Sequence, residues 1–202
     1  MLSAVSAVAA GVALTGSPTS ARARADFTPA RHKEDAWFDE LPGKHRVFID
    51  SAATESVSSA LLYAGNLFTA NKSGYGLEDG DIATVVCLRH NGTVFAYTDT
   101  IWSKYGKALA DSAKYVNPRS TEPPTANPQR NIASLAKRGV HFAVCGLATR
   151  RIAGQIATAV SGNTDEIHKE LIANLVPNGH LMAAGVVATT RAQEYGYSIL
   201  VA

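Results

Sequence analysis

The sequence predicts a three-layer α/β fold, in which a mainly parallel five-stranded sheet lies between helices on both of its faces. Two observations lead to this prediction. Short apolar runs alternate with longer segments of helical periodicity over residues 45–202. The inner runs are apolar at nearly every position, which is typical of parallel strands that are covered on both faces. With 202 residues, of which 46% are hydrophobic and 18% charged, the chain is long enough for one domain with a sizeable core.

Each strand is expected where β-branched and aromatic residues gather in a short run. These runs are 45–51 (HRVFIDS), 82–89 (IATVVCLR), 140–145 (VHFAVC), the very short pair 175–176 (LV) and 197–201 (YSILV). Helices are expected over about 54–71, in part of 93–113, and over 129–137, 147–160, 163–175 and 180–194. The proline-rich segment 117–128 (NPRSTEPPTANP) is predicted to be a surface loop of the domain.

The first 44 residues are expected to lie outside the α/β pattern. Residues 4–14 form an apolar stretch of the length of a secretory signal core, and small residues that suit cleavage follow it. Residues 1–25 are therefore interpreted as a signal or targeting segment of an exported, periplasmic protein; the alternative is a disordered tail on a cytoplasmic protein. The apolar stretch is too short to span a bilayer, so no stable membrane insertion is expected. Residues 26–44 are predicted to form a lead-in arm whose Trp37 and Phe38 pack on the domain.

Composition excludes several classes of function. The formal net charge is +2, and no basic stripe alternates with aromatic residues, which argues against a nucleic-acid partner. No His/Cys cluster has the spacing of zinc ligands, and neither a G-x-G-x-x-G nor a phosphate-binding P-loop motif occurs. The sequence therefore predicts neither a metal site nor a nucleotide cofactor. Two cysteines do not make a disulfide scaffold.

Cys145 is the candidate catalytic residue, because it ends an apolar strand and precedes a helix, at the strand end where parallel sheets bind ligands. A helix N-terminus and nearby cations favour the nucleophilic thiolate of a cysteine. Gly146 is expected to leave backbone N–H groups free to face an anion. At least one of Arg150 and Arg151 is expected to turn toward the site, and Arg150 is taken as ligand-binding. The alternative for Cys145 is a small hydrophobic residue that ends a buried strand.

Other candidate residues follow neighbouring strands of the predicted sheet. His90, beside Arg89, ends the second strand, and it is expected to act as a base or as a charge partner of the Cys145 thiolate, with Arg89 binding ligand. The alternative for His90 is a polar residue on an exposed turn. Asn178, in a Pro-Asn-Gly segment, could donate a hydrogen bond to a ligand; the alternative is an ordinary turn. Cys87 lies inside an apolar run and is expected to be buried and unreactive, with a disulfide to Cys145 as the alternative in an oxidising compartment.

Four segments resemble the DsrE-like proteins of intracellular sulfur metabolism. They are HRVFIDSA, VVCLRHNGTVFAYTDTIWSKYG, GVHFAVCGLATRR and LVPNGHLMAAGVVATTRAQEYGYSILV, and the resemblance covers about residues 45–202. It implies a five-stranded parallel sheet between helices and a homo- or hetero-oligomer, and for this chain a homo-oligomer is expected. Several members of this family carry sulfur as a persulfide on a cysteine that follows a strand, and Cys145 stands at that position.

The resemblance and the residues together lead to one functional hypothesis and two alternatives. The hypothesis is that the protein binds or relays sulfur as a persulfide on Cys145, with His90 assisting and with a sulfur donor or acceptor protein as partner. The first alternative is a non-enzymatic module that binds a small anion or a nucleotide, with an incidental cysteine. The second is an oligomer-forming protein with no small-molecule site.

Overall fold

Five parallel strands form a single sheet in the order β4-β3-β2-β1-β5. The structure is a computed structural model that describes residues 28–118 and 120–202. The strands are β1 (His45–Ser51), β2 (Ile82–Leu88), β3 (His141–Cys145), β4 (Gly179–Met182) and β5 (Ser198–Val201). Since all five strands run in the same direction, their carboxyl ends meet at one edge of the sheet, which is the edge where such folds bind ligands.

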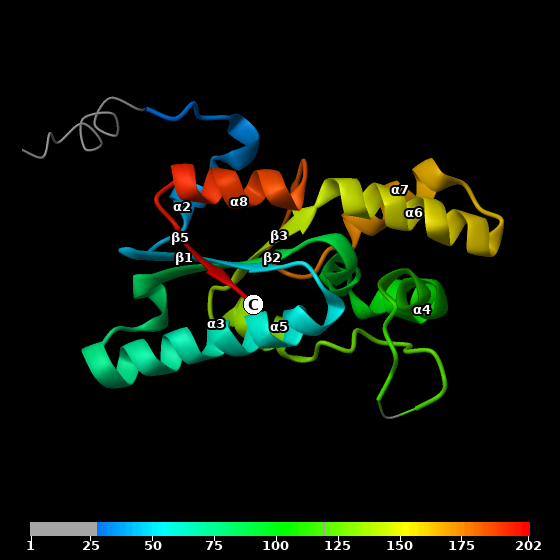
Figure 1. Cartoon of the computed structure of the whole chain (residues 1–202), viewed down its shortest axis with the longest axis horizontal. Helices are drawn as coiled ribbons and strands as arrows, with labels where there is room; N and C mark the ends of the chain where they lie inside the picture. Colours follow the sequence, from blue (N-terminus) through cyan, green and yellow to red (C-terminus); the bar gives the residue numbers. More distant parts are fainter. Residues whose placement is uncertain (1–27, 119) are drawn as a thin grey trace, which may run out of the picture. The chain divides into compact units, whose positions relative to one another are not determined.

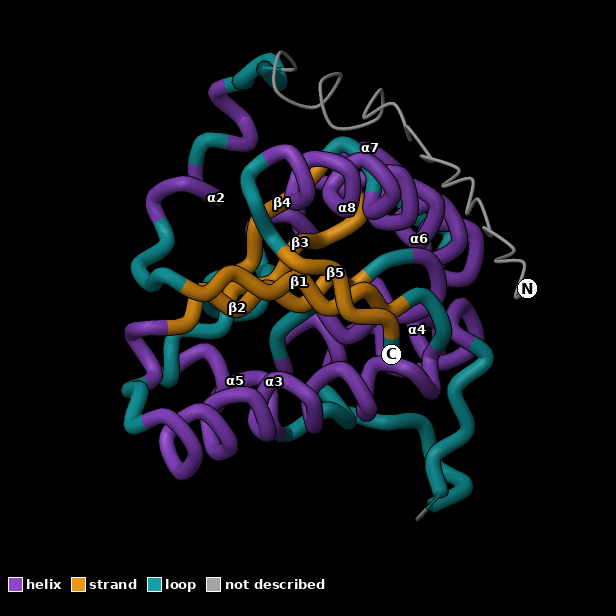
Figure 2. The backbone as a smooth tube through the Cα atoms, turned by 60° about the vertical axis from the view of Figure 1, so that its left-hand side comes forward, coloured by secondary structure: helices purple, strands orange, loops and turns teal. Residues whose placement is uncertain are grey.

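Helices cover both faces of this sheet, which confirms the predicted three-layer fold (Figures 1 and 2). One face carries α3 (Thr54–Tyr75) and α5 (Asn131–Lys137), and the opposite face carries α2 (Trp37–Glu40) and α8 (Gly185–Glu194). Three further helices pack against one another beside the carboxyl edge of the sheet: α4 (Asp99–Ala113), α6 (Gly146–Val160) and α7 (Thr164–Ala173). Three short 3₁₀ helices complete the fold: η1 (Lys33–Asp35), η2 (Asp79–Asp81) and η3 (His90–Ala96).

The central strand β2 is buried on both faces of the sheet, as its nearly continuous apolar sequence predicts. All seven of its residues are buried. Val86 and Leu88 belong to the core beneath α3, whereas Val85 and Cys87 belong to the core beneath α2 and α8. Because successive side chains of a strand point to opposite faces, a strand covered on both faces is apolar at nearly every position, and in β2 the exception is the buried Thr84.

The arm that precedes β1 is part of the domain, since residues 31–202 form one compact unit. Phe38 is fully buried beneath α8, and its carbonyl accepts a hydrogen bond of 2.8 Å from the Tyr197 hydroxyl. Trp37 stacks on the ring of His180, with 3.9 Å between the ring centroids. These contacts confirm the predicted packing of Trp37 and Phe38. They also show that α2 completes a face of the sheet that α8 alone would leave partly open.

A pair of histidines lies beneath Trp37 on neighbouring strands. His141 Nδ1 and His180 Nε2 are 2.8 Å apart, so one neutral imidazole donates its N–H to the other. Burial lowers the pKa of both side chains, and burial together with the neighbouring His141 lowers the pKa of His180 to about 4. The two imidazoles beneath Trp37 therefore carry no charge at neutral pH.

The prediction of the fourth strand is wrong. Residues 175–176 form no strand of the sheet: Leu175 makes an isolated bridge to Tyr97, and Val176 donates its N–H to the Ala96 carbonyl. The strand is β4, which follows the Pro-Asn-Gly segment instead of preceding it. As a short edge strand that begins with Gly179 and His180, it lacks the apolar run of a covered strand. The last helix consequently begins at Gly185, five residues later than predicted.

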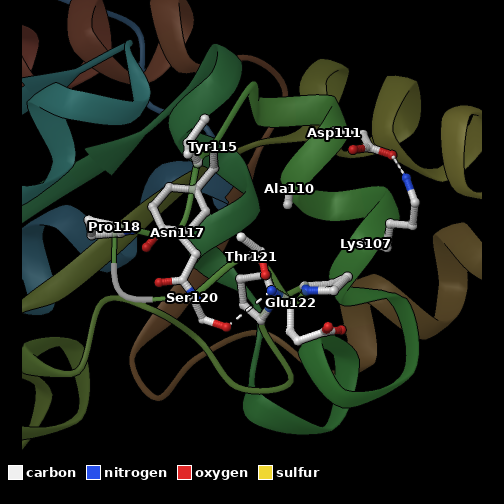
Figure 3. Close-up of a pocket in the computed structure, with 12 residues that line it drawn as sticks. Lys107, Ala110, Asp111, Tyr115, Asn117, Pro118, Ser120, Thr121 and Glu122 are labelled. Carbon is white, nitrogen blue, oxygen red and sulfur yellow. Dashed lines mark hydrogen bonds and ion pairs between the residues drawn. The ribbon is translucent and has the colours of Figure 1, made fainter.

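The described part of the proline-rich loop 117–128 is anchored on α4. The buried side-chain amide of Asn127 donates to the carbonyls of Phe95 and Tyr97, each at 2.9 Å. Gly106 of α4 lies directly against the Pro124 carbonyl, where an added Cβ would overlap the oxygen. Figure 3 shows the open pocket of about 680 Å³ that this segment forms with α4, next to the ion pair of Lys107 and Asp111. The side chain of Asn127 and the close packing of Gly106 on the Pro124 carbonyl thus hold the loop in place.

The predicted signal or targeting segment, residues 1–25, lies outside the described residues. Within the described ranges, none of the helices combines the length and the apolar character that crossing a membrane requires.

Gly106→Ala is expected to destabilise the protein by about 1–3 kcal/mol, because the new methyl group overlaps the Pro124 carbonyl and forces the loop or α4 to move. Gly154→Ala is the matched control: its methyl group would meet only Thr164 Cγ2 at 4.0 Å, so we expect a gain within about 1 kcal/mol from helix propensity. Urea denaturation measures both changes. Equal effects of the two substitutions would contradict the anchoring role of Gly106.

The stability of the protein is expected to fall as the pH is lowered from about 7 toward 4. The pKa of His180 is about 4 in the folded protein, against 6.5 for an ordinary histidine, so the unfolded chain takes up its proton first and acid favours unfolding. Thermal denaturation between pH 7 and pH 5 measures this slope. The slope should become shallower in His180→Asn, and an unchanged slope would show that the histidine pair is not its source.

Candidate functional site

Two helices begin side by side at the carboxyl edge of the sheet. β3 ends at Cys145 and leads directly into α6, and β4 ends at Met182 and leads within three residues into α8. A pocket of about 520 Å³ lies between these helix starts, and we call it the Cys145 pocket. Its lining residues are Arg89, His90, Cys145, Leu147, Ala148, Arg151, Ala184, Gly185 and Val186.

Cys145 is the N-cap residue of α6 and lies at the bottom of the pocket. Its Sγ accepts a hydrogen bond of 3.4 Å from the backbone N–H of Ala148, and 8% of the residue is exposed. Gly146 lets the helix begin so close to the sheet, since an added Cβ would come within 2.6 Å of the Met182 carbonyl oxygen. In the first turn of α6, the backbone N–H of Ala148 points at the sulfur. Gly146 itself contributes close packing and does not line the pocket.

A buried chain of hydrogen bonds supports Cys145 from below. The Thr149 hydroxyl donates to the Cys145 carbonyl at 3.0 Å, and the Tyr97 hydroxyl donates to Thr149 Oγ1 at 3.1 Å. Thr149 and Tyr97 are fully buried, and burial raises the pKa of Tyr97, so its hydroxyl keeps its proton. These contacts hold the backbone of Cys145 in place from the side opposite the pocket.

Arg89 and Asp50 form a bidentate ion pair across the ends of β2 and β1. Arg89 Nε and Nη2 lie 2.7 Å and 2.8 Å from the two carboxylate oxygens of Asp50, and these hydrogen bonds raise the pKa of Arg89. Gly185, the first residue of α8, packs directly on the stem of Arg89, where any Cβ would overlap Arg89 Cβ. The positive charge of Arg89 is therefore neutralised by Asp50 at the wall of the pocket.

His90 and Arg151 also line the Cys145 pocket. His90 is exposed and adopts a left-handed backbone conformation (φ 52°), which turns the chain from β2 into η3. The guanidinium of Arg151 donates to Gln155 Oε1 at 2.9 Å and to the His90 carbonyl at 3.4 Å. Within residues 28–118 and 120–202, no carboxylate pairs with Arg151. The Cys145 pocket therefore holds one positive charge that no described acidic side chain offsets.

Cys87 lies near Cys145 on the same face of the sheet, but the two thiols cannot join directly. The strand register pairs Cys87 with Ala143, so Cys145 lies two residues further along the neighbouring strand. With strands ~4.8 Å apart and a rise of ~3.3 Å per residue, the two Cα atoms are ~8 Å apart, beyond the ~7 Å reach of a disulfide. Both cysteines are free, and burial, reinforced by the charge of Asp50, raises the pKa of the Cys87 thiol.

Sequence reasoning placed two further residues in the site, and the structure moves both out of it. Arg150 pairs with Asp165 of α7 at 2.6 Å and points away from the pocket, because successive residues of a helix are turned by about 100°. Asn178 lies at the amino end of β4, the opposite edge of the sheet, where its amide donates to the carbonyls of Ala136 and Val140. The Pro-Asn-Gly segment is therefore an ordinary turn, the alternative considered above, and Asn178 adopts a left-handed backbone conformation in it (φ 59°).

Two residues that shape the pocket were not predicted as site residues, Asp50 and Gly185. Asp50 is an acidic residue that directly follows the apolar run 47–49, and this position was the signal that it has a buried partner. Gly185 carried no such signal, since its contact with Arg89 depends on the packing of α8. Of the two arginines considered for the site, Arg151 is the one that lines the pocket. Among the described residues, no group of three or more His, Cys, Asp or Glu side chains could hold a metal ion.

Asp50→Asn is expected to lower the free energy of unfolding by about 1–3 kcal/mol, because it leaves the half-buried Arg89 guanidinium without its charged partner. The pair of Arg138 and Asp79 is a matched control, since it is also bidentate but more exposed, with 38% and 35% of the side chains accessible. Asp79→Asn should cost at most about 1 kcal/mol. Chemical denaturation compares the two variants, and a larger loss for Asp79→Asn would contradict this description of the pocket wall.

Comparisons with known proteins identify no family for this chain. No protein-family model matches it, and no curated protein matches it. Among solved structures, the protein of unknown function MTH1491 from Methanobacterium thermoautotrophicum is similar, with 17% sequence identity and a TM-score of 0.43. The match covers 79% of this chain and 100% of the other. At this level of similarity, the likeness adds nothing to the assignment of function.

Proposed function

We propose that this protein is a DsrE-like sulfur carrier that holds a sulfur atom as a persulfide on Cys145. The observation that carries the proposal is the position of the Cys145 thiol, which caps the N-terminus of α6 at the bottom of an open pocket. The resemblance of the strand and turn segments to DsrE-like proteins supports the same role for this cysteine. The second cysteine, Cys87, is fully buried and serves as core.

The surroundings of Cys145 suit an anionic sulfur. The N–H of Ala148 points at Sγ, and the N-terminal turn of a helix attracts negative charge. In the proposed reaction, the Cys145 thiolate attacks the outer sulfur of a donor and forms a new S–S bond. The donor leaves with the electron pair of its broken S–S bond, and the transferred sulfur remains as the terminal atom of the persulfide. The exposed His90 imidazole, on the rim of the pocket, is the group we propose to take the thiol proton.

Delivery of the sulfur would use an external thiol. An acceptor thiolate attacks the outer sulfur of the persulfide, and Cys145 leaves as a thiolate, which restores the starting state. Because Cys87 lies beyond disulfide distance, resolution of the persulfide within the chain would require movement of the backbone. We therefore propose that a separate donor or acceptor protein completes the cycle and that the carrier is a homo-oligomer, as the resemblance implies.

One observation favours a second candidate, a module that binds a small anion without transferring sulfur. Arg151 supplies a positive charge to the pocket that no described carboxylate offsets, and this charge would attract an anion whether or not Cys145 reacts. The two candidates differ in what happens to the thiol. Ligand-induced thermal stabilisation that persists in Cys145→Ala, without any sulfur on the wild-type protein, would favour the binding module.

Treatment with sodium polysulfide, followed by removal of the excess, is expected to add sulfur to the wild-type protein. Intact mass spectrometry should show a gain of one sulfur atom that cyanide removes. Cys145→Ala should gain none, because its nucleophile is absent. Cys87→Ala is the matched control, and it should gain sulfur as the wild type does, since Cys87 is buried beneath α8. Equal loading of Cys145→Ala and the wild type would contradict the proposal.

A further inference from the structure

The entrance to the Cys145 pocket restricts what can reach the thiol. Two exposed apolar side chains flank it at the starts of α6 and α8: Leu147, which is 70% exposed, and Val186, which is 61% exposed. Cys145 lies below them with 8% exposure. A small molecule can enter the pocket of about 520 Å³, whereas a partner protein would have to insert a side chain or a loop to reach Sγ. The geometry thus favours a low-molecular-weight donor for loading the thiol.

The charges of the pocket select the kind of molecule. Arg89 is neutralised by the bidentate contact with Asp50, so it adds little net attraction. Arg151 lines the pocket, and its hydrogen-bond partners within residues 28–118 and 120–202 are neutral: the side chains of Gln155 and Ser112 and the carbonyl of His90. A guanidinium in this state keeps its charge and retains N–H donors for an incoming anion. Arg151 and Cys145 both line this pocket, so an anion bound in it lies in a site whose wall includes the guanidinium and the thiol.

We propose that the Cys145 pocket takes a sulfur oxyanion of the thiosulfate type, with Arg151 holding the oxyanion end and Cys145 attacking the sulfane sulfur. This inference rests on the proposed function and adds the substrate class and a residue that selects it. Arg151 acts here as a binding residue, and the apolar rim of Leu147 and Val186 lowers the exposure of the bound anion to water.

The step balances without an oxidant or a reductant. The Cys145 thiolate donates an electron pair to the sulfane sulfur of thiosulfate and forms the Sγ–S bond. The S–S bond of thiosulfate breaks, and its electron pair leaves on sulfite. The sulfane sulfur stays on Cys145 as the persulfide anion, so the total charge is the same before and after. Arg151 stabilises the sulfite group as negative charge develops on it.

The test compares Arg151→Gln with Arg150→Gln. The two arginines are neighbours in the chain, but only Arg151 lines the pocket, whereas Arg150 pairs with Asp165 on the outer side of α6. Sulfite release from thiosulfate is measured with a sulfite-specific dye, and persulfide formation on Cys145 is measured by intact mass. We expect Arg151→Gln to slow sulfite release about tenfold, the size of one charge-assisted hydrogen bond, while Arg150→Gln keeps the wild-type rate.

A second readout reports the charge at Cys145 independently of sulfur transfer. Iodoacetate and iodoacetamide alkylate the same thiol and differ by one negative charge. The rate constant for iodoacetate divided by that for iodoacetamide should fall about threefold or more in Arg151→Gln, because a single nearby positive charge is removed. In Arg150→Gln this ratio should stay unchanged. An effect of Arg151 on local structure alone would change both alkylation rates together and leave the ratio as it is.

The outcomes separate this inference from the proposed function. If polysulfide loads Cys145 but thiosulfate does not, the oxyanion inference is wrong and the sulfur carrier stands. If Arg151→Gln releases sulfite as fast as the wild type, or if Arg150→Gln is slowed to the same extent, Arg151 does not select the donor. If neither polysulfide nor thiosulfate loads Cys145, the proposed function fails, and this inference fails with it.

Discussion

The close contact between the start of α8 and the end of β2 determines the candidate site. Gly185 lies so near the stem of Arg89 that no side chain fits between them. Beside this contact, the guanidinium of Arg89 donates through Nε and Nη2 to the two carboxylate oxygens of Asp50 on β1. The same helix start covers Cys87, while Cys145, on the next strand and two residues further along, lies at the pocket. Around this contact, Arg89 is neutralised, Cys87 is fully buried and Cys145 keeps 8% exposure.

The start of α6, on the other side of the pocket, also depends on a close glycine contact. Gly146 brings α6 against the Met182 carbonyl, and the resulting helix N-terminus faces the sulfur of Cys145. The buried hydroxyls of Thr149 and Tyr97 support this turn from within the core. Two glycine contacts and a chain of hydrogen bonds therefore define the geometry of the pocket. Preorganisation of this kind is what a reactive group needs if its geometry is to stay productive.

Much of the fold follows from local patterns in the sequence. The apolar β2 and β3 runs predict covered parallel strands, and the position of Cys145 at a strand end follows from them. The edge strand β4 was missed because Gly179, His180 and the exposed Leu181 do not form an apolar run. Residue spacing alone also could not determine whether Arg150 or Arg151 faces the pocket. Both follow the same strand, and only the packing of α6 on α7 determines which of them faces the pocket.

A crystal structure of the protein after reaction with a sulfane-sulfur donor is the most direct test of the central claim. The account predicts a second sulfur atom bonded to Cys145 Sγ, lying in the pocket between the starts of α6 and α8 and turned toward Arg151. An unmodified Cys145 in protein that has taken up sulfur, or sulfur bound at Cys87 instead, would contradict it.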